Sequence, residues 1–136
     1  MTPVSKIDVT LPATTQSLRI VRQLFTGIRD ELGSDQRLSD VRLAVTEACA
    51  NAIVHAYRGD PGEIGLQSTI ADGVLAVTIR DGGAGITPSI GTRHGTGIGL
   101  ALMLSVADEV LFRSSSEFGT TVKLSFDLPM ARQPTT

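Results

Sequence analysis

A carboxylate and a carboxamide stand four residues apart in the middle of this chain. Glu47 and Asn51 belong to a segment typical of a helix, so their side chains lie on one helical face about one turn apart, and His55 continues that face. Asn51 could offer its side-chain oxygen to Mg²⁺, which keeps several waters and takes much of its ligation from nucleotide phosphates. Glu47 could orient or deprotonate an attacking hydroxyl or water. The helix taken alone is better explained by a solvated polar face.

A glycine-rich segment with an acid at its start runs from Asp81 to Gly85. It follows a hydrophobic run typical of a strand. A carboxylate at that point can accept a hydrogen bond from an exocyclic amino group such as that of adenine, and glycines let a flat ring approach the backbone closely. Taken by itself, the segment could also be a simple turn.

A second glycine-rich segment, Gly95-Thr96-Gly97-Ile98-Gly99-Leu100, opens a helix. Backbone N–H groups there could surround phosphate oxygens, and the helix N-terminus adds its positive dipole end. The segment is not a dinucleotide fingerprint, since the preceding strand and the downstream acid are missing, and it contains no Gly-Lys-Ser/Thr of a Walker loop. Alone, it indicates a phosphate site only weakly.

Composition bounds the class of protein. The chain has 136 residues, 41% hydrophobic and 19% charged, with a formal net charge of −2. This predicts one domain over 1–136, with a core of about 6–128 and a flexible tail over 129–136. The charge gives no general reason to propose nucleic-acid or membrane binding, and neither an apolar run of roughly 20 residues nor a secretory signal is present. The single cysteine, Cys49, is interpreted as a small buried hydrophobe and is compatible with the reducing cytoplasm that we expect.

The hydrophobic spacing predicts the elements that must position these residues, in the order β-α-α-β-β-α-β-β. The first half contains a strand over 6–11, a helix from Ser17 to about Gly33, and a helix capped by Ser34 or Ser39 that carries Glu47 to His55. Two strands follow over 64–70 and 75–79, joined by a turn at Asp72-Gly73. The last elements are a helix over 97–107, a strand beginning at 110 and a strand over 122–128. Residues 82–95 show no period and are interpreted as a mobile loop. The fold class is therefore α+β: a two-layer α/β sandwich with about five mostly antiparallel strands and three helices on one face.

Four segments follow one another along the chain: Glu-x-x-x-Asn-x-x-x-His on a helix, Asp-Gly-Gly-Ala-Gly after a strand, Gly-Thr-Gly-Ile-Gly-Leu at a helix start, and Gly119-Thr120-Thr121 before the last strand. This set resembles the GHKL (Bergerat) ATP-binding fold of gyrases, heat-shock chaperones, MutL proteins and sensor histidine kinases. The resemblance covers roughly Lys6 to Leu128. Within that superfamily the chain resembles the small bacterial anti-sigma factor serine kinases, which have a similar Ala-Val-Thr-Glu-Ala-Cys-Ala-Asn-Ala helix and a short ATP lid.

The resemblance implies roles for individual residues. Glu47 looks like the catalytic base, Asn51 like the Mg²⁺ ligand and Asp81 like the acid that reads adenine. Thr120 or Thr121 would help to close the adenine end. Glycines would line the base at Gly83 and Gly85, and would cradle phosphates at Gly95, Gly97 and Gly99. Further nucleotide contacts are expected from His55, Ile86, Arg93, Thr96, Ile98 and Leu100, although Arg93 could instead contact a partner or simply be solvated.

The resemblance also implies an activity and partners. Members of this family bind a sigma factor and phosphorylate a serine of a small anti-anti-sigma (STAS-type) protein, often as homodimers. We therefore expect a serine kinase that uses ATP and Mg²⁺ in a partner-switching pathway, without direct contact to nucleic acid or membrane. One alternative is an ATP-binding module that sequesters the sigma factor without catalysis. Another is a detached histidine-kinase catalytic domain, which is weakened because no segment resembles a phosphoacceptor helical hairpin.

Overall fold

The computed structural model describes residues 4–56, 61–82, 96–115 and 119–129. These ranges contain five strands and four α-helices, with one π-helical turn after the longest helix. In chain order they are β1 Val4–Pro12, α1 Thr15–Thr26, α2 Arg29–Leu32, α3 Asp35–Asn51, the π-helical turn η1 Ala52–Ala56, β2 Glu63–Ala71, β3 Val74–Asp81, α4 Thr96–Val106, β4 Glu109–Ser115 and β5 Gly119–Asp127.

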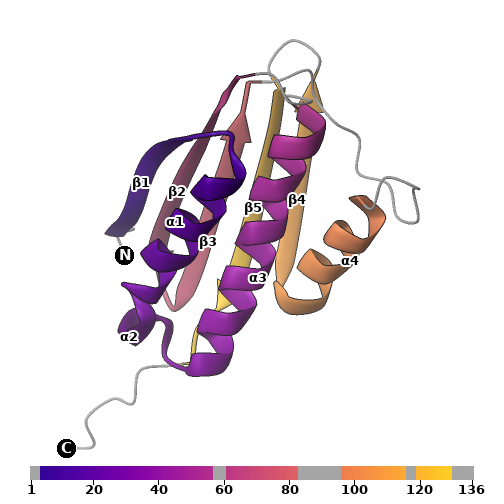
Figure 1. Ribbon diagram of the computed structural model, residues 1–136. Helices are drawn as coiled ribbons and strands as arrows, with labels where there is room; N and C mark the ends of the chain where they lie inside the picture. Colours follow the sequence, from indigo (N-terminus) through magenta and orange to yellow (C-terminus); the bar gives the residue numbers. More distant parts are fainter. Residues whose placement is uncertain (1–3, 57–60, 83–95, 116–118, 130–136) are drawn as a thin grey trace, which may run out of the picture.

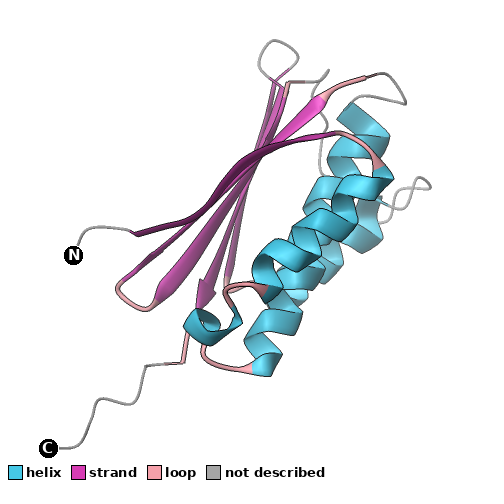
Figure 2. Ribbon diagram, turned by 60° about the vertical axis from the view of Figure 1, so that its left-hand side comes forward, coloured by secondary structure: helices cyan, strands magenta, loops and turns pink. Residues whose placement is uncertain are grey.

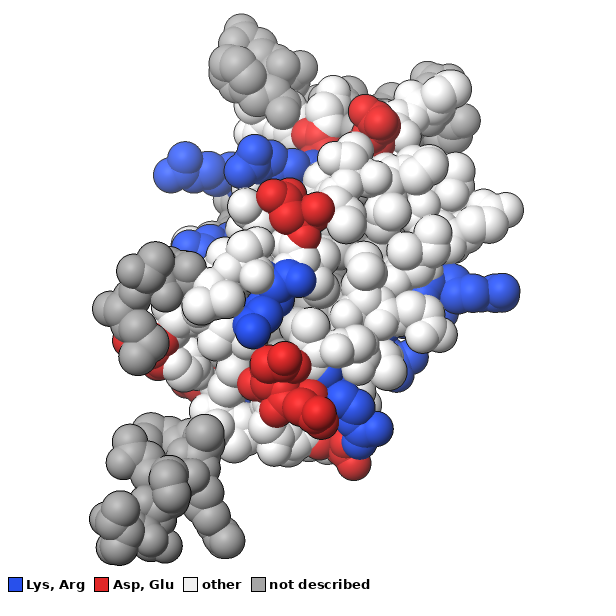
Figure 3. All heavy atoms as spheres, turned by 90° about the vertical axis from the view of Figure 1, so that its left-hand side faces the viewer, with Lys and Arg blue, Asp and Glu red and all other residues white. Residues whose placement is uncertain are grey.

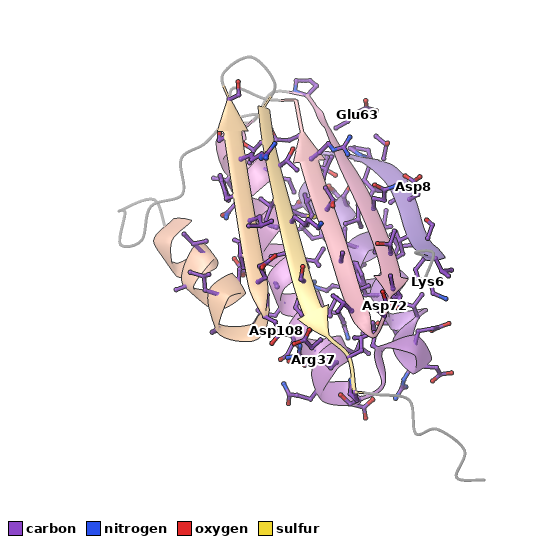
Figure 4. The ribbon with its side chains drawn as sticks, turned by 180° about the vertical axis from the view of Figure 1, so that it is seen from behind. Lys6, Asp8, Arg37, Glu63, Asp72 and Asp108 are labelled. Carbon is purple, nitrogen blue, oxygen red and sulfur yellow. The ribbon has the colours of Figure 1, made fainter. Side chains whose placement is uncertain are left out.

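The five strands form one sheet in the order β1-β2-β3-β5-β4, and every neighbouring pair is antiparallel. Helices α1 and α3 cover one face of the sheet, and α4 lies beside α3 (Figures 1 and 2). The other face carries no helix in the described part of the chain (Figure 4). The predicted two-layer α+β sandwich is therefore confirmed.

The core lies between the helices and the sheet. Alternate residues of the central strands point into it, and Val77 on β3 stands opposite Leu124 on β5 in the strand register. The apolar stripe of α3 is buried against them: Leu38, Val41, Val45 and Ala48, continued by Ala52 in η1. Cys49 belongs to the same core, and burial raises the pKa of its thiol to about 12. The interpretation of this cysteine as a small buried hydrophobe is confirmed.

The surface mixes charges of both signs. On the face that Figure 3 shows, acidic and basic side chains are interspersed among uncharged ones. This arrangement agrees with the small net charge of −2. Within the parts of the chain that the structure describes, every helix is too short or too polar to pass through a lipid bilayer.

The first helix differs from its prediction. A continuous helix from Ser17 to about Gly33 was expected, but α1 ends at Thr26, and the short α2 begins only at Arg29. Gly27 caps α1, and Ile28 N–H then bonds the carbonyl only three residues back, at Phe25. Glycine is the weakest helix former apart from proline, which favours a break there. The apolar spacing continues across the break because Phe25 and Leu32 both reach the core, so periodicity could not reveal it.

The second helix begins as predicted but ends earlier. Ser34 is its cap, since its hydroxyl accepts a hydrogen bond from the N–H of Arg37 at 3.1 Å. The α-helix ends at Asn51, and Ala52–Ala56 form the π-helical turn η1. His55 therefore lies in η1, where each residue advances by less than an α-helical step. Its side chain lies outside the described residues, so its expected nucleotide contact stays a prediction.

Candidate functional site

Glu47 and Asn51 lie at the edge of the helix layer, beside the buried stripe of α3. Both side chains are half-buried, next to the fully buried Val45 and Ala48. The buried stripe faces the sheet, so the acid and the amide face sideways toward α4, which packs against α3. Both side chains therefore look out from the edge of the core.

Gly99 on α4 lies close to this pair. A Cβ placed on Gly99 would lie 3.1 Å from Oε2 of Glu47 and 3.4 Å from Oδ1 of Asn51. The first of these contacts is tighter than real side chains usually make, so any residue other than glycine would press against the carboxylate of Glu47. The structure thus brings together the predicted acid–amide pair and the start of the glycine-rich helix.

Asp81 occupies the last position of β3 and is buried. It stands directly opposite Thr120 of β5, whose backbone N–H donates a hydrogen bond to Oδ1 of Asp81 at 3.3 Å. The hydroxyl of Thr120 lies 3.2 Å from that of Ser114 on β4. This buried carboxylate is thus held at the end of the two central strands.

The strand register separates the two threonines that the sequence left as alternatives. Residues 119–121 were expected before the last strand, but β5 already begins at Gly119. Thr120 is buried on the helix side of the sheet, beside Asp81. Thr121 pairs with Arg80 and points to the opposite face, because side chains alternate along a strand. Only Thr120 therefore lies where it can act together with Asp81.

The acid–amide pair and the buried acid lie at the same end of the molecule. The end of α3, the end of β3 and the start of β5 meet at the top of Figure 1, and η1 contacts β5 there. Glu47 and Asn51 belong to the helix layer, whereas Asp81 and Thr120 belong to the sheet. A ligand bound at this end would be contacted from both layers.

The remaining predicted residues are only partly described. Thr96, Gly97 and Ile98 form the first residues of α4, but their side chains lie outside the described residues. Leu100 is half-buried and packs on the core, which leaves its backbone rather than its side chain for a ligand. Outside the described residues altogether lie Gly83, Gly85, Ile86, Arg93 and Gly95.

Two features of this region were missed in the sequence. The first is Ser114, whose hydroxyl contacts that of Thr120. No sequence pattern around Ser114 indicates this contact, because it depends on the register of β4 against β5. Glu47 also borders a surface hollow of about 360 Å³ between α1 and α3, lined by Arg22, Ser39, Arg42, Leu43 and Thr46. Helical spacing places Ser39, Leu43 and Glu47 on one face, but it cannot show that α1 completes the hollow.

The residues present fit a magnesium nucleotide. Among the described residues, no group of three or more His, Cys, Asp or Glu side chains could hold a metal. Mg²⁺ does not need such a group when phosphates and waters supply most of its ligands, and one amide oxygen such as Oδ1 of Asn51 then suffices. The missing side chain of Gly99 lets the backbone at the start of α4 approach that oxygen closely, and N–H groups at a helix start can bind phosphate oxygens.

Comparison with known proteins defines the class. The model of the histidine kinase-like ATPase domain family matches residues 11–126, so the chain belongs to this family. Within it, the chain is similar to two kinds of bacterial regulator. The anti-sigma F factor of Geobacillus stearothermophilus is 37% identical over 98 residues, which cover 64% of this chain and 67% of that protein. The serine-protein kinase RsbW of Bacillus velezensis is 31% identical over 140 aligned positions, which cover 91% and 86%.

A solved structure supports the fold assignment. The histidine kinase domain of the blue-light activated histidine kinase from Erythrobacter litoralis EL346 superposes with a TM-score of 0.58 at 21% sequence identity. The match covers 87% of this chain and 62% of that chain, which is less than two thirds of its length. At this identity the likeness shows a shared fold. The resemblance to GHKL-type domains and to the anti-sigma factor kinases is confirmed by these matches together.

Replacing Gly119 tests how closely β5 approaches Asp81. Gly119 has φ +81°, and a Cβ there would overlap the carbonyl oxygen of Asp81 and lie 2.9 Å from Cα of Gly82. We expect Gly119→Ala to lower the free energy of unfolding by about 3 kcal/mol, because strain at positive φ adds to this overlap. Urea unfolding measures the loss.

Gly73→Ala is the matched control for this substitution. Gly73 has a similar φ of +77°, but nothing lies within 4 Å of a Cβ placed there. It should cost only about 1 kcal/mol, from backbone strain alone. Equal losses at the two glycines would show that the approach to Asp81 does not constrain the chain.

Proposed function

We propose that this chain is a protein serine kinase and anti-sigma factor that uses Mg·ATP in a bacterial partner-switching pathway. The observation that carries the proposal is the convergence of Glu47, Asn51 and the backbone of Gly99 at one point. An acid, an amide and a helix start can supply the positioning and the electrostatic stabilisation by which phosphoryl transfer is mainly catalysed. The similarity to proteins named serine-protein kinase and anti-sigma F factor supports the proposal.

The nucleotide is proposed to lie across the end where both layers meet. Asp81 accepts a hydrogen bond from the adenine amino group, and Thr120 and the glycines Gly83 and Gly85 complete that end. The phosphates lie against the start of α4. When bound, Mg²⁺ would neutralise charge on the phosphate oxygens, and Oδ1 of Asn51 would be its protein ligand.

Glu47 is proposed to act on the acceptor. The carboxylate takes the proton from a serine hydroxyl while the serine oxygen attacks the γ-phosphorus and the bond from that phosphorus to the ADP oxygen breaks. The hollow beside Glu47 supports this role, because it leaves the carboxylate open to a side chain from another protein. The acceptor is proposed to be a serine of an anti-anti-sigma (STAS-type) protein in the cytoplasm, with the kinase acting as a homodimer.

A second function, sequestration of a sigma factor without catalysis, is favoured by one observation. Several similar proteins carry the name anti-sigma F factor, which states binding and no reaction. Both readings use the same nucleotide site, so they differ only in whether Glu47 acts on an acceptor. Histidine phosphorylation has weaker support, because the solved histidine kinases are similar at the level of fold.

Glu47→Gln tests the catalytic role. The purified protein is incubated with Mg·ATP labelled on the γ-phosphate and with candidate anti-anti-sigma proteins, and label on serine is measured. We expect the substitution to reduce transfer by at least about 100-fold, because the amide cannot accept the proton. Calorimetry should show ATP affinity largely unchanged. Glu31→Gln, at an exposed position on α2, is the matched control and should transfer normally.

The outcomes of this experiment separate the proposals. Undiminished transfer by Glu47→Gln would rule out the base assignment. ATP binding without label on any candidate serine would favour the sequestering function, whereas label on histidine would support the histidine-kinase alternative.

Asp81→Asn tests the adenine end. The substitution removes the charge that is proposed to accept from the adenine amino group, and hydrogen bonds to charged groups contribute about 1.5–3 kcal/mol. We therefore expect affinity for ATP and for adenosine to fall about 10- to 100-fold in calorimetry. Asp8→Asn, on the far side of the sheet (Figure 4), should leave both affinities unchanged. Unaltered adenosine affinity in Asp81→Asn would remove this acid from the site.

A further inference from the structure

Arg37 joins several segments of the chain near the start of α3. Its guanidinium pairs with Asp40 on the same helix at 2.5 Å and with Asp108 at 3.0 Å. It also donates to the carbonyls of Val106 at 3.3 Å and Asp127 at 3.4 Å. The group lies 5.8 Å from the ring centroid of Phe126, and only 19% of its side chain is exposed. One side chain thus links α3, the end of α4 and the end of β5.

The contacts of Arg37 fasten one end of α4. Val106 is the last residue of that helix, and its carbonyl is among the groups that a helix leaves without intrahelical partners. Asp108 follows two residues later, and its Oδ2 accepts from both Arg37 and the backbone N–H of Asp127. Figure 4 shows Arg37 and Asp108 side by side at the end of the sheet opposite the candidate site.

The other end of α4 has a different kind of attachment. Gly99 meets Glu47 and Asn51 without a side chain of its own. The helix packs mainly on α3, with a smaller contact to β4, and its Leu104 is half-exposed. Over eleven residues it is about 16 Å long, so a small rotation about its C-terminal end moves its start appreciably.

We propose that Arg37 is a positioning residue for the phosphate end of the nucleotide. By holding the C-terminal end of α4 on α3, it sets where the start of α4 stands relative to Glu47 and Asn51. Arg37 precedes Glu47 by ten residues on the same helix, about 15 Å along its axis, and so acts through α4 rather than on ATP. The inference rests on the proposed ATP-binding function, and it adds a residue that no nucleotide motif contains.

The two ends of the nucleotide should respond differently. Asp81 and Thr120 sit on β3 and β5, which pair along their whole length independently of α4. The phosphates depend on the placement of α4. Removing the side chain of Arg37 should therefore weaken binding of ATP and leave binding of adenosine unchanged. If Arg37 had a purely structural role, its removal would lower thermal stability without this difference between the two ligands.

The experiment compares Mg·ATP and adenosine by calorimetry, at a temperature well below the unfolding midpoint of each variant. In Arg37→Ala we expect the Kd for Mg·ATP to rise about tenfold, a usual size for coupling between distant groups, and the Kd for adenosine to stay within about twofold. Asp108→Ala keeps Arg37 paired with Asp40 and should raise the Kd for Mg·ATP several-fold. If Arg37→Ala does not fold, the Kd values of Asp108→Ala test the positioning role instead.

Arg29→Ala is the matched control. Arg29 forms an exposed ion pair with Asp35 at 2.7 Å near the same end of α3, so this pair joins α2 to α3 and not to α4. Its removal should change neither Kd. An unchanged Kd for Mg·ATP in Arg37→Ala or Asp108→Ala, or an equal loss for adenosine, would overturn the positioning role. If the unmodified protein binds no Mg·ATP, the proposed function itself fails.

Discussion

Burial of the apolar face of α3 is the constraint on which the rest of the structure depends. Val41, Val45 and Ala48 are buried where this helix contacts β3 and β5. With 3.6 residues per turn, fixing those three fixes the direction of every other side chain on the helix. Glu47 and Asn51 are thereby turned toward α4, and Arg37 is turned toward the end of α4. The packing of one helix face thus orients Glu47, Asn51 and Arg37, to each of which a role is assigned.

The central strand pair makes the complementary contribution. Asp81 reaches the interior because β3 alternates buried and outward positions up to its last residue. A slip of one residue against β5 would turn the carboxylate to the open face of the sheet. The close backbone approach at Gly119 and the hydrogen bond from Thr120 both hold this register. The helix layer and the sheet therefore meet at a common end, each with its own polar groups.

Much of this arrangement could be predicted because it depends on local periodicity. The four-residue step from Glu47 to Asn51 and the position of Asp81 at a strand end follow from spacing alone. The break at Gly27 and the π-helical turn after Asn51 could not be predicted, since the apolar pattern continues through the first and gives no sign of the second. The choice between Thr120 and Thr121 needed the register of β5. The role of Arg37 could not be predicted, because its partners beyond α3 (Val106, Asp108 and Asp127) lie about 70 to 90 residues away in the chain.

The central claim is that a magnesium nucleotide binds where the two layers meet. Hydrogen–deuterium exchange with and without Mg·ATP tests it most directly. The account predicts slower exchange at the end of α3, at the start of α4 and around Asp81 and Thr120. Exchange in β1 and in the part of β2 farthest from Asp81 should be unchanged. Protection confined to the open face of the sheet, around Gln67 and Thr78, or no protection at saturating Mg·ATP, would contradict it.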